Sequence, residues 1–275
     1  MELTAEQFTK LTKLIYKKLG LQFDEKKIYF LNKRVERRIV HLNLKTADEY
    51  IFQLGYCDNK GEEMQALANL ITTNETYMFR EFEQLAAFAD VCMPELIGAR
   101  QKTKDRRVRI WCAGCSSGEE AYTLAIIIRE VFPDSANWDI QIVATDIDEN
   151  MIKLARNAVY GDRSVKFVPA DYSKHLIPTV TGFRVVPETA RLVRVEKLNL
   201  NNPEEMKAMR GYDFVFCRNV LIYFDAASQR SVVNHFYDAL NPRGYIFLGH
   251  SESVSRITSA FRLKKAEGHL LYQKD

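Results

Sequence analysis

The sequence predicts an α/β protein in which a mostly parallel sheet, covered by helices, follows a small helical domain and carries a small β insertion. Residues 1–72 read as consecutive amphipathic helices. From residue 108 onward, short apolar runs alternate with helical patterns, which is typical of βαβ units. At about residues 161–198 two short strand patterns interrupt this alternation, which indicates an inserted β-subdomain.

The helical domain is predicted from capping residues that precede apolar-periodic segments. Thr4, Asp24 and Thr46 are placed as N-caps, because their side chains can accept hydrogen bonds from the first turn of a helix. Gly20 marks the end of the first helix. We expect four helices, over residues 4–20, 24–42, 46–55 and 61–71.

The second helix combines an apolar stripe with a basic surface. The stripe consists of Ile28, Leu31, Val35, Ile39 and Leu42. Residues 1–42 carry ten Lys/Arg against five Asp/Glu, a net charge of +5 where the whole chain has +3. Such a surface is either a solvated helix face or a docking surface for nucleic acid, anionic lipid or an acidic protein. The basic residues are Lys26, Lys33 and Arg37 opposite the stripe, and Lys27, Arg34 and Arg38 on its flank.

The rest of the chain follows the α/β pattern. A helix over 81–97 and a charged linker over 100–107 lead into it, so we place a connecting segment at 73–107 and the main domain at 108–275. "FRVVP" and "RLVRVEKL" are expected to form the inserted hairpin. The main strands are expected at 108–112, 140–145, 213–217 and 245–248 with a final pair within 261–273, and the helices at 119–132, 149–158 and 226–240.

The composition excludes several classes of protein. With 47% hydrophobic residues the chain is not disordered, and its apolar runs fall short of the ~18 residues that a membrane-spanning helix needs. The start of the chain lacks a secretion-signal pattern, so we expect a cytoplasmic protein. The five scattered cysteines are then expected to be reduced thiols.

The stretch "RVRIWCAGCSSGEEAYTLAIII" (107–128) allows three interpretations. Gly114, Ser116 and Gly118 form G-x-S-x-G, but a hydrolase elbow needs earlier strands and an oxyanion loop, which the preceding helices do not offer. His250 or His269 could complete a triad only formally.

Cys112 and Cys115 form C-x-x-C, the second interpretation. A metal site would need a second ligand pair at compatible spacing, and Cys112 lies inside a predicted strand, whereas a redox pair begins a helix. Both cysteines are therefore expected to be packing residues, and no metal site is expected.

The third interpretation, a strand, a small-residue turn and a helix that seat a nucleotide-like cofactor, has independent support. Asp146 ends the next strand, 28 residues beyond Gly118, where a carboxylate can meet a ribose diol. Glu119 and Glu120 would repel a pyrophosphate. They suit a phosphate-free ligand with a positive group, such as S-adenosylmethionine (SAM).

Five co-linear motifs extend this hypothesis. They are "LITTNETYMFRE", "AGCSSGEEAYTLA", "ATDIDENMIKLAR", "DFVFCRNVLIYF" and "PRGYIFLGHSES". Together they resemble the CheR-type chemotaxis methyltransferases, which use SAM to methylate glutamate side chains of chemoreceptors. The resemblance implies a helical N-terminal domain, a class I SAM-dependent methyltransferase fold with a seven-stranded, mostly parallel sheet, and an inserted β-subdomain.

The resemblance also implies the roles of individual residues. Arg80 and Tyr223 are expected at the reacting end of the site, Arg80 holding the SAM carboxylate or steering the glutamate. The remaining cofactor residues are Asn74 and Thr76 at the methionine end, Glu119 or Glu120 at its amino group, Asp146 at the ribose, Asn199 and Leu200 at the adenine, and Arg218 and Asn219 at the carboxyl edge of the sheet.

The implied partner is the cytoplasmic helical bundle of a chemoreceptor, docked on the six basic residues, with S-adenosylhomocysteine (SAH) as product. We expect a monomer without membrane insertion or a nucleic-acid partner. Two alternatives stay open. A nucleic-acid methyltransferase would explain the basic helix, although "RNVLIYF" lacks a Pro-Pro-aromatic turn and Cys217 is poorly placed as a nucleophile. A non-catalytic SAM-binding regulator is the other.

Overall fold

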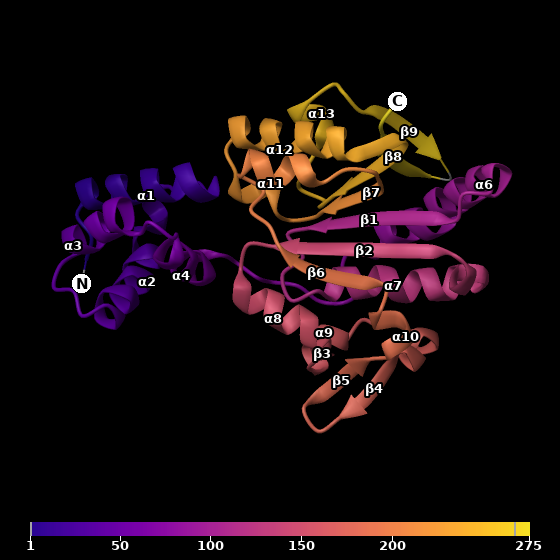
Figure 1. The fold of residues 1–275 in the computed structure, drawn as a ribbon, viewed down its shortest axis with the longest axis horizontal. Helices are drawn as coiled ribbons and strands as arrows, with labels where there is room; N and C mark the ends of the chain where they lie inside the picture. Colours follow the sequence, from indigo (N-terminus) through magenta and orange to yellow (C-terminus); the bar gives the residue numbers. More distant parts are fainter. Residues whose placement is uncertain (1, 267) are drawn as a thin grey trace.

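The computed structural model describes residues 2–266 and 268–275. A helical bundle lies beside one end of a three-layered α/β domain, and a small sheet lies at an edge of that domain (Figure 1). The connection between the bundle and the α/β domain runs past the end of the large sheet where β1 and β2 terminate (Figure 1).

The bundle consists of α1 (Ala5–Leu19), α2 (Ile28–His41), α3 (Ala47–Phe52) and α4 (Glu62–Ile71). Its core is fully buried at Leu11, Leu31 and Leu67, and the predicted apolar stripe of α2 faces this core. Thr4 forms a capping box with Gln7, which confirms the predicted helix start.

The start of the second helix differs from the prediction. A 3₁₀ turn (Glu25–Lys27) precedes α2, and the Asp24 side chain makes no capping hydrogen bond. A π-helical turn (Gln53–Cys57) extends α3. Helix termini often tighten or widen in this way, because the last backbone groups lack regular helical partners.

The connecting helix is longer than predicted. It comprises α5 (Phe82–Ala87), a π-helical turn (Phe88–Cys92) and α6 (Met93–Thr103), so half of the expected linker at 100–107 is helical. The π-helical turn places the ring of Phe88 edge-on against Phe214 and Phe216 of the sheet, with centroids 5.1 and 5.4 Å away.

The large sheet has seven strands with β1 near its centre. If these seven strands are numbered by their order in the chain, their order across the sheet is 3-2-1-4-5-7-6. Only β10, the second strand from one edge, runs antiparallel to both of its neighbours. The spatial order is β6 (Val193–Lys197), β2 (Asp139–Asp146), β1 (Arg107–Ala113), β7 (Tyr212–Cys217), β8 (Leu240–Leu248), β10 (His269–Gln273) and β9 (Arg262–Ala266).

Helices cover both faces of this sheet because its central strands are apolar on both sides. Ile110 and Cys112 of β1 pack toward one cluster, and Trp111 and Ala113 pack toward the other. The first face carries α5, α6, α7 (Glu119–Val131) and α8 (Glu149–Asn157), and the second carries α11 (Pro203–Ala208), α12 (Ala226–Ala239) and α13 (Val254–Ile257).

The inserted sheet corrects one prediction. It consists of β3 (Val159–Tyr160), β5 (Gly182–Val185) and β4 (Leu176–Thr179), all antiparallel. "RLVRVEKL" is not its second strand: it forms β6, which pairs in parallel with β2 in the large sheet. The inserted subdomain, expected at 161–198, therefore ends before β6, and its predicted C-terminal boundary was wrong. The short helices α9 (Asp162–Val165) and α10 (Pro187–Ala190) flank the strands.

Candidate functional site

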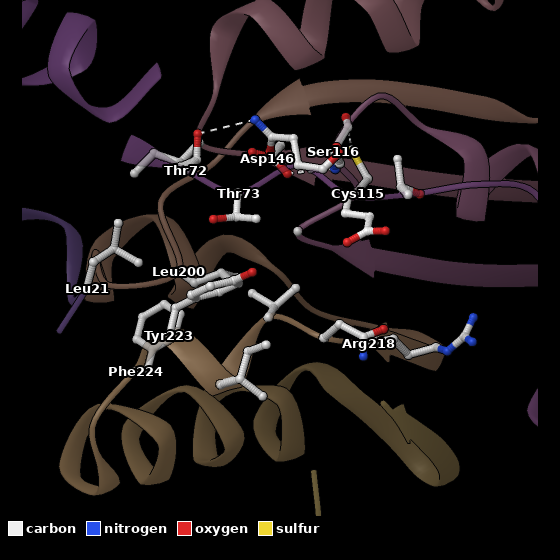
Figure 2. A pocket seen from close by; sticks show the side chains of 18 of the residues that line it. Leu21, Thr72, Thr73, Cys115, Ser116, Asp146, Leu200, Arg218, Tyr223 and Phe224 are labelled. Carbon is white, nitrogen blue, oxygen red and sulfur yellow. Dashed lines mark hydrogen bonds between the residues drawn. The ribbon is translucent and has the colours of Figure 1, made fainter. Parts of the chain in front are cut away.

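A cavity of about 610 Å³ opens between the helical bundle and the carboxyl ends of β1, β2 and β7. The turns after all three strands line it, together with the segment between α1 and α2 and the connection after α4 (Figure 2). Its volume is that of a typical small-molecule site, and open α/β sheets place their ligands at this edge.

The turn after β1 is built from small residues because its backbone turns sharply. Gly114, Ser116 and Gly118 all have positive φ angles, of 78°, 50° and 94°. A Cβ atom on Gly114 would lie 2.5 Å from a methyl group of Val220, so glycine lets the turn after β1 approach the loop after β7.

Asp146 ends β2 on the cavity wall and is 7% exposed. Its two carboxylate oxygens accept hydrogen bonds from the backbone N–H groups of Ser116 (2.7 Å) and Asp148 (2.9 Å). Burial raises the pKa of Asp146, and these two N–H donors offset part of that rise. A carboxylate held in this way can accept hydrogen bonds from a ribose diol.

The two glutamates that open α7 have different surroundings. Glu119 accepts hydrogen bonds from the hydroxyls of Ser117 (2.7 Å) and Ser164 (2.9 Å) and is absent from the cavity wall. Glu120 lines the cavity and lies 3.2 Å from Nη1 of Arg218. Burial raises the pKa of Glu120, and the adjacent guanidinium of Arg218 offsets part of the rise. Of the two predicted alternatives, the structure brings only Glu120 to the cavity.

Arg218 and Asn219 follow β7 and also line the cavity. The guanidinium of Arg218, with 3% of its side chain exposed, contacts Glu120 and lies 3.1 Å from a carboxylate oxygen of Glu81. Its Nε is buried without a hydrogen-bond partner in the described part of the chain. Asn219 has a φ of 60°, and its amide donates to Glu81 over 3.3 Å.

The connection after α4 brings Asn74, Thr76 and Arg80 to the cavity. The Asn74 amide donates to the carboxylate of Asp148 over 2.8 Å, which ties this connection to the end of β2. The Arg80 guanidinium donates to the carbonyl of Glu75 over 2.8 Å and keeps 27% of its side chain exposed. Its Nε also lies 3.9 Å from a carboxylate oxygen of the largely buried Glu81, a long ion pair that a ligand in the cavity could replace.

Asn199, Leu200 and Tyr223 line the opposite wall. The Asn199 amide already donates to the carbonyl of Lys18 over 2.8 Å, and Leu200 is buried. Tyr223 is half-buried, and Figure 2 shows its hydroxyl toward the cavity. The structure thus brings every predicted cofactor and catalytic residue except Glu119 to one cavity.

The six basic residues divide into two groups. Arg34 donates to the carbonyls of Leu70 and Phe30, and Arg38 forms an ion pair of 2.6 Å with the buried Glu63, so both stabilise the bundle. The exposed group comprises Lys26, Lys27, Lys33 and Arg37, of which Lys26 and Lys27 also line the cavity.

The surroundings of the two C-x-x-C cysteines do not favour redox chemistry. Cys112 and Cys115 are buried free thiols, and burial raises the pKa of each well above its usual value. Within residues 2–266 and 268–275, no three His, Cys, Asp or Glu side chains are grouped to hold a metal ion.

Sequence reasoning missed three acidic residues that organise the site. Glu81 meets Arg218, Asp148 meets Asn74, and Glu252 accepts hydrogen bonds from the backbone N–H groups of Asn219 (2.8 Å), Val220 (3.1 Å) and Gly249 (2.7 Å). All three lie inside the quoted motifs: Glu81 follows Arg80 and Asp148 lies two residues after Asp146, whereas the motif that contains Glu252 was assigned no site residue. Their presence in these motifs was the available signal.

The strand order, together with a cavity at the carboxyl ends of β1, β2 and β7, defines a class I SAM-dependent methyltransferase fold, as expected. Residues 74–269 match the CheR methyltransferase SAM-binding domain, and residues 6–72 match the CheR methyltransferase all-alpha domain. The chain therefore belongs to the CheR methyltransferase family and is a methyltransferase.

Curated relatives agree with this assignment along nearly the whole chain. Chemotaxis protein methyltransferase 2 of Vibrio cholerae is 36% identical over 99% of this chain and 94% of its own length. The chemotaxis protein methyltransferase of Borreliella burgdorferi is 30% identical over 92% and 90%, and that of Escherichia coli is 30% identical over 96% and 90%. None of the described helices combines the length and the hydrophobicity that a membrane-spanning helix requires.

Proposed function

We propose that this protein transfers a methyl group from SAM to the side-chain carboxylate of specific glutamates on chemoreceptors, with SAH as product. The observation that carries the proposal is the gathering of the predicted cofactor and reacting-end residues in one cavity beside an exposed basic surface. The relatives named above are chemotaxis methyltransferases, which supports a receptor as the substrate.

The residues present fit SAM. Asp146 offers carboxylate oxygens to ribose hydroxyls, and Glu120 offers a carboxylate to an amino group, at separate places on the wall. The guanidinium of Arg218 lies beside Glu120 on the cavity wall and helps to hold that carboxylate in place. Arg80 would meet the carboxylate of the methionine end, with Asn74 and Thr76 beside it, and Asn199 and Leu200 would flank the adenine.

Bound SAM would supply an activated methyl group on a positively charged sulfur. The protein then has no proton to remove, because a glutamate carboxylate is already ionised at neutral pH. Its residues have to align the carboxylate and exclude water, since neutralising two opposite charges is favoured in a dry site. The Tyr223 hydroxyl can orient the incoming carboxylate, and Arg80 can attract it.

The exposed basic surface of Lys26, Lys27, Lys33 and Arg37 is proposed to dock the receptor. It leads to the cavity, because Lys26 and Lys27 belong to both. An acidic helical bundle in the cytoplasm would be attracted to this surface and guided toward Tyr223. Arg34 and Arg38 support the surface from within the bundle rather than reaching the receptor. We propose that the protein acts as a monomer.

The test is incubation of the protein with methyl-labelled SAM and chemoreceptor-containing membranes, followed by alkali. Glutamyl methyl esters hydrolyse in alkali, so we expect label on the receptor that is released as volatile methanol. Label that survives alkali, or that enters added DNA or RNA, would contradict the proposal. Absence of any transfer together with SAH binding would indicate a non-catalytic SAM-binding regulator instead.

A further inference from the structure

The segment that joins α1 to α2 contacts the loop that carries Tyr223. Leu21 forms an isolated antiparallel β-bridge with Phe224, and the backbone N–H of Gln22 donates to the carbonyl of Tyr223 over 3.0 Å. Figure 2 shows Leu21 on the side of the cavity where Tyr223 and Phe224 lie. The helical bundle therefore holds the backbone of Tyr223 directly.

Gly20 makes this approach possible. Its φ of 74° is a left-handed conformation that ends α1. A Cβ atom at this position would lie 2.8 Å from Oδ1 of Asn201 and 2.8 Å from Cε1 of Phe224, both in the α/β domain. A side chain at residue 20 would therefore force Asn201 and Phe224 to shift beside the β-bridge.

Further hydrogen bonds surround the bridge on both sides. The Asn199 amide donates to the carbonyl of Lys18, one of the carbonyls that the end of α1 leaves unpaired. The Tyr16 hydroxyl donates to the carboxylate of Asp225 over 3.0 Å, directly after Phe224. These contacts fix the end of α1 against both the adenine side and the reacting side of the cavity.

We infer that the helical domain is a positioning element of the active site, in addition to its proposed docking role. The segment Gly20–Gln22 sets the position of Tyr223, and Gly20 is the positioning residue that permits the contact. This inference rests on the proposed role of Tyr223 at the reacting end. A displacement of ~1 Å in such a group can lower turnover about 100-fold.

The test compares Gly20→Ala with Gly61→Ala in the full chain. Gly61 has nearly the same φ, 72°, but an added Cβ meets nothing within 4 Å, so it controls for backbone strain alone. We expect turnover at saturating SAM and receptor to fall at least tenfold for Gly20→Ala and less than about twofold for Gly61→Ala. SAH affinity, measured by calorimetry, should change less than turnover does.

Equal turnover in the two glycine variants would overturn the inference, and so would a loss in SAH affinity that matches the loss in turnover. If Gly20→Ala does not fold, Tyr16→Phe removes the contact with Asp225 without backbone strain, and Tyr56→Phe at an exposed site is its control. Turnover should then fall severalfold for Tyr16→Phe only, and an unchanged value would overturn the inference. Absence of glutamyl methylation by the wild-type protein would contradict the proposed function instead.

Discussion

Nη1 of Arg218 lies 3.2 Å from the carboxylate of Glu120, and the same guanidinium reaches Glu81, so one buried arginine joins the loop after β7 to α7 and to the connection after α4. Removing one partner from a buried ionic group is costly because a desolvated charge then stays unpaired. The cavity wall at this point depends on all three side chains.

The first prediction concerns this arginine. Arg218→Lys keeps the charge but cannot supply several donors in one plane, so the free energy of unfolding should fall by about 1–3 kcal/mol. Arg194→Lys, which changes an exposed arginine paired with Glu196, should change it by less than about 0.5 kcal/mol. Denaturant unfolding of the two variants would decide, and equal effects would contradict the role given to Arg218.

The second prediction concerns Asp146. Asp146→Ala removes the acceptor for ribose hydroxyls and should weaken SAM and SAH binding by about 1.5–3 kcal/mol. Asp139→Ala, at the opposite end of β2, should leave the affinity unchanged. Calorimetry with SAH measures both, and an unchanged affinity in Asp146→Ala would refute this placement of the cofactor.

The third prediction follows from the raised pKa of Asp146, which burial causes. At a pH between the ordinary pKa of an aspartate and this raised pKa, Asp146 of the folded chain holds a proton that Asp146 of the unfolded chain has released. The contribution of Asp146 to stability therefore falls as the pH rises through this window. Asp146→Asn should flatten that part of the stability curve in the ligand-free protein. A curve that keeps the wild-type slope there would show that Asp146 titrates normally.

The fourth prediction separates catalysis from folding. Arg80→Ala and Tyr223→Phe should lower turnover strongly, because both side chains lie at the proposed reacting end, while leaving the melting temperature close to that of the wild type. Methyl transfer and circular-dichroism melts give the two measurements. Wild-type turnover in both variants would contradict the assignment.

The fifth prediction tests the docking surface. Lys33→Glu with Arg37→Glu should leave SAH affinity and fold intact, reduce receptor methylation, and make the remaining activity less sensitive to salt, since such contacts are screened over ~8 Å. Lys102→Glu with Lys265→Glu makes the same change in charge at exposed positions of α6 and β9 and should have little effect (Figure 1).

The result also distinguishes the alternatives for this surface. Tight, steeply salt-dependent binding to DNA or RNA that the reversal at Lys33 and Arg37 abolishes would favour a nucleic-acid partner. If the reversal alters neither receptor methylation nor nucleic-acid binding, the surface is only a solvated helix face.

Local patterns in the sequence predicted most of the fold. Caps at Thr4 and Thr46 mark helix starts, the apolar stripe of α2 marks its buried face, and the alternation of strands and helices indicates the α/β class. The structure confirms all three. The position of Asp146 at the end of β2 was predictable for the same reason, because strand ends are local features.

The sequence by itself therefore determined most of the elements, the family resemblance and most of the predicted residues at the cavity. The tertiary structure decided which partner each residue meets. The alternating pattern at 193–197 predicts a strand but not its sheet, and β2 supplied the partner. Glu119 and Glu120 are neighbours in sequence, yet they point about 100° apart around α7, so only one reaches the cavity. The contact of Gly20 with Phe224 joins residues 204 positions apart, and no local pattern can encode the distance between two domains.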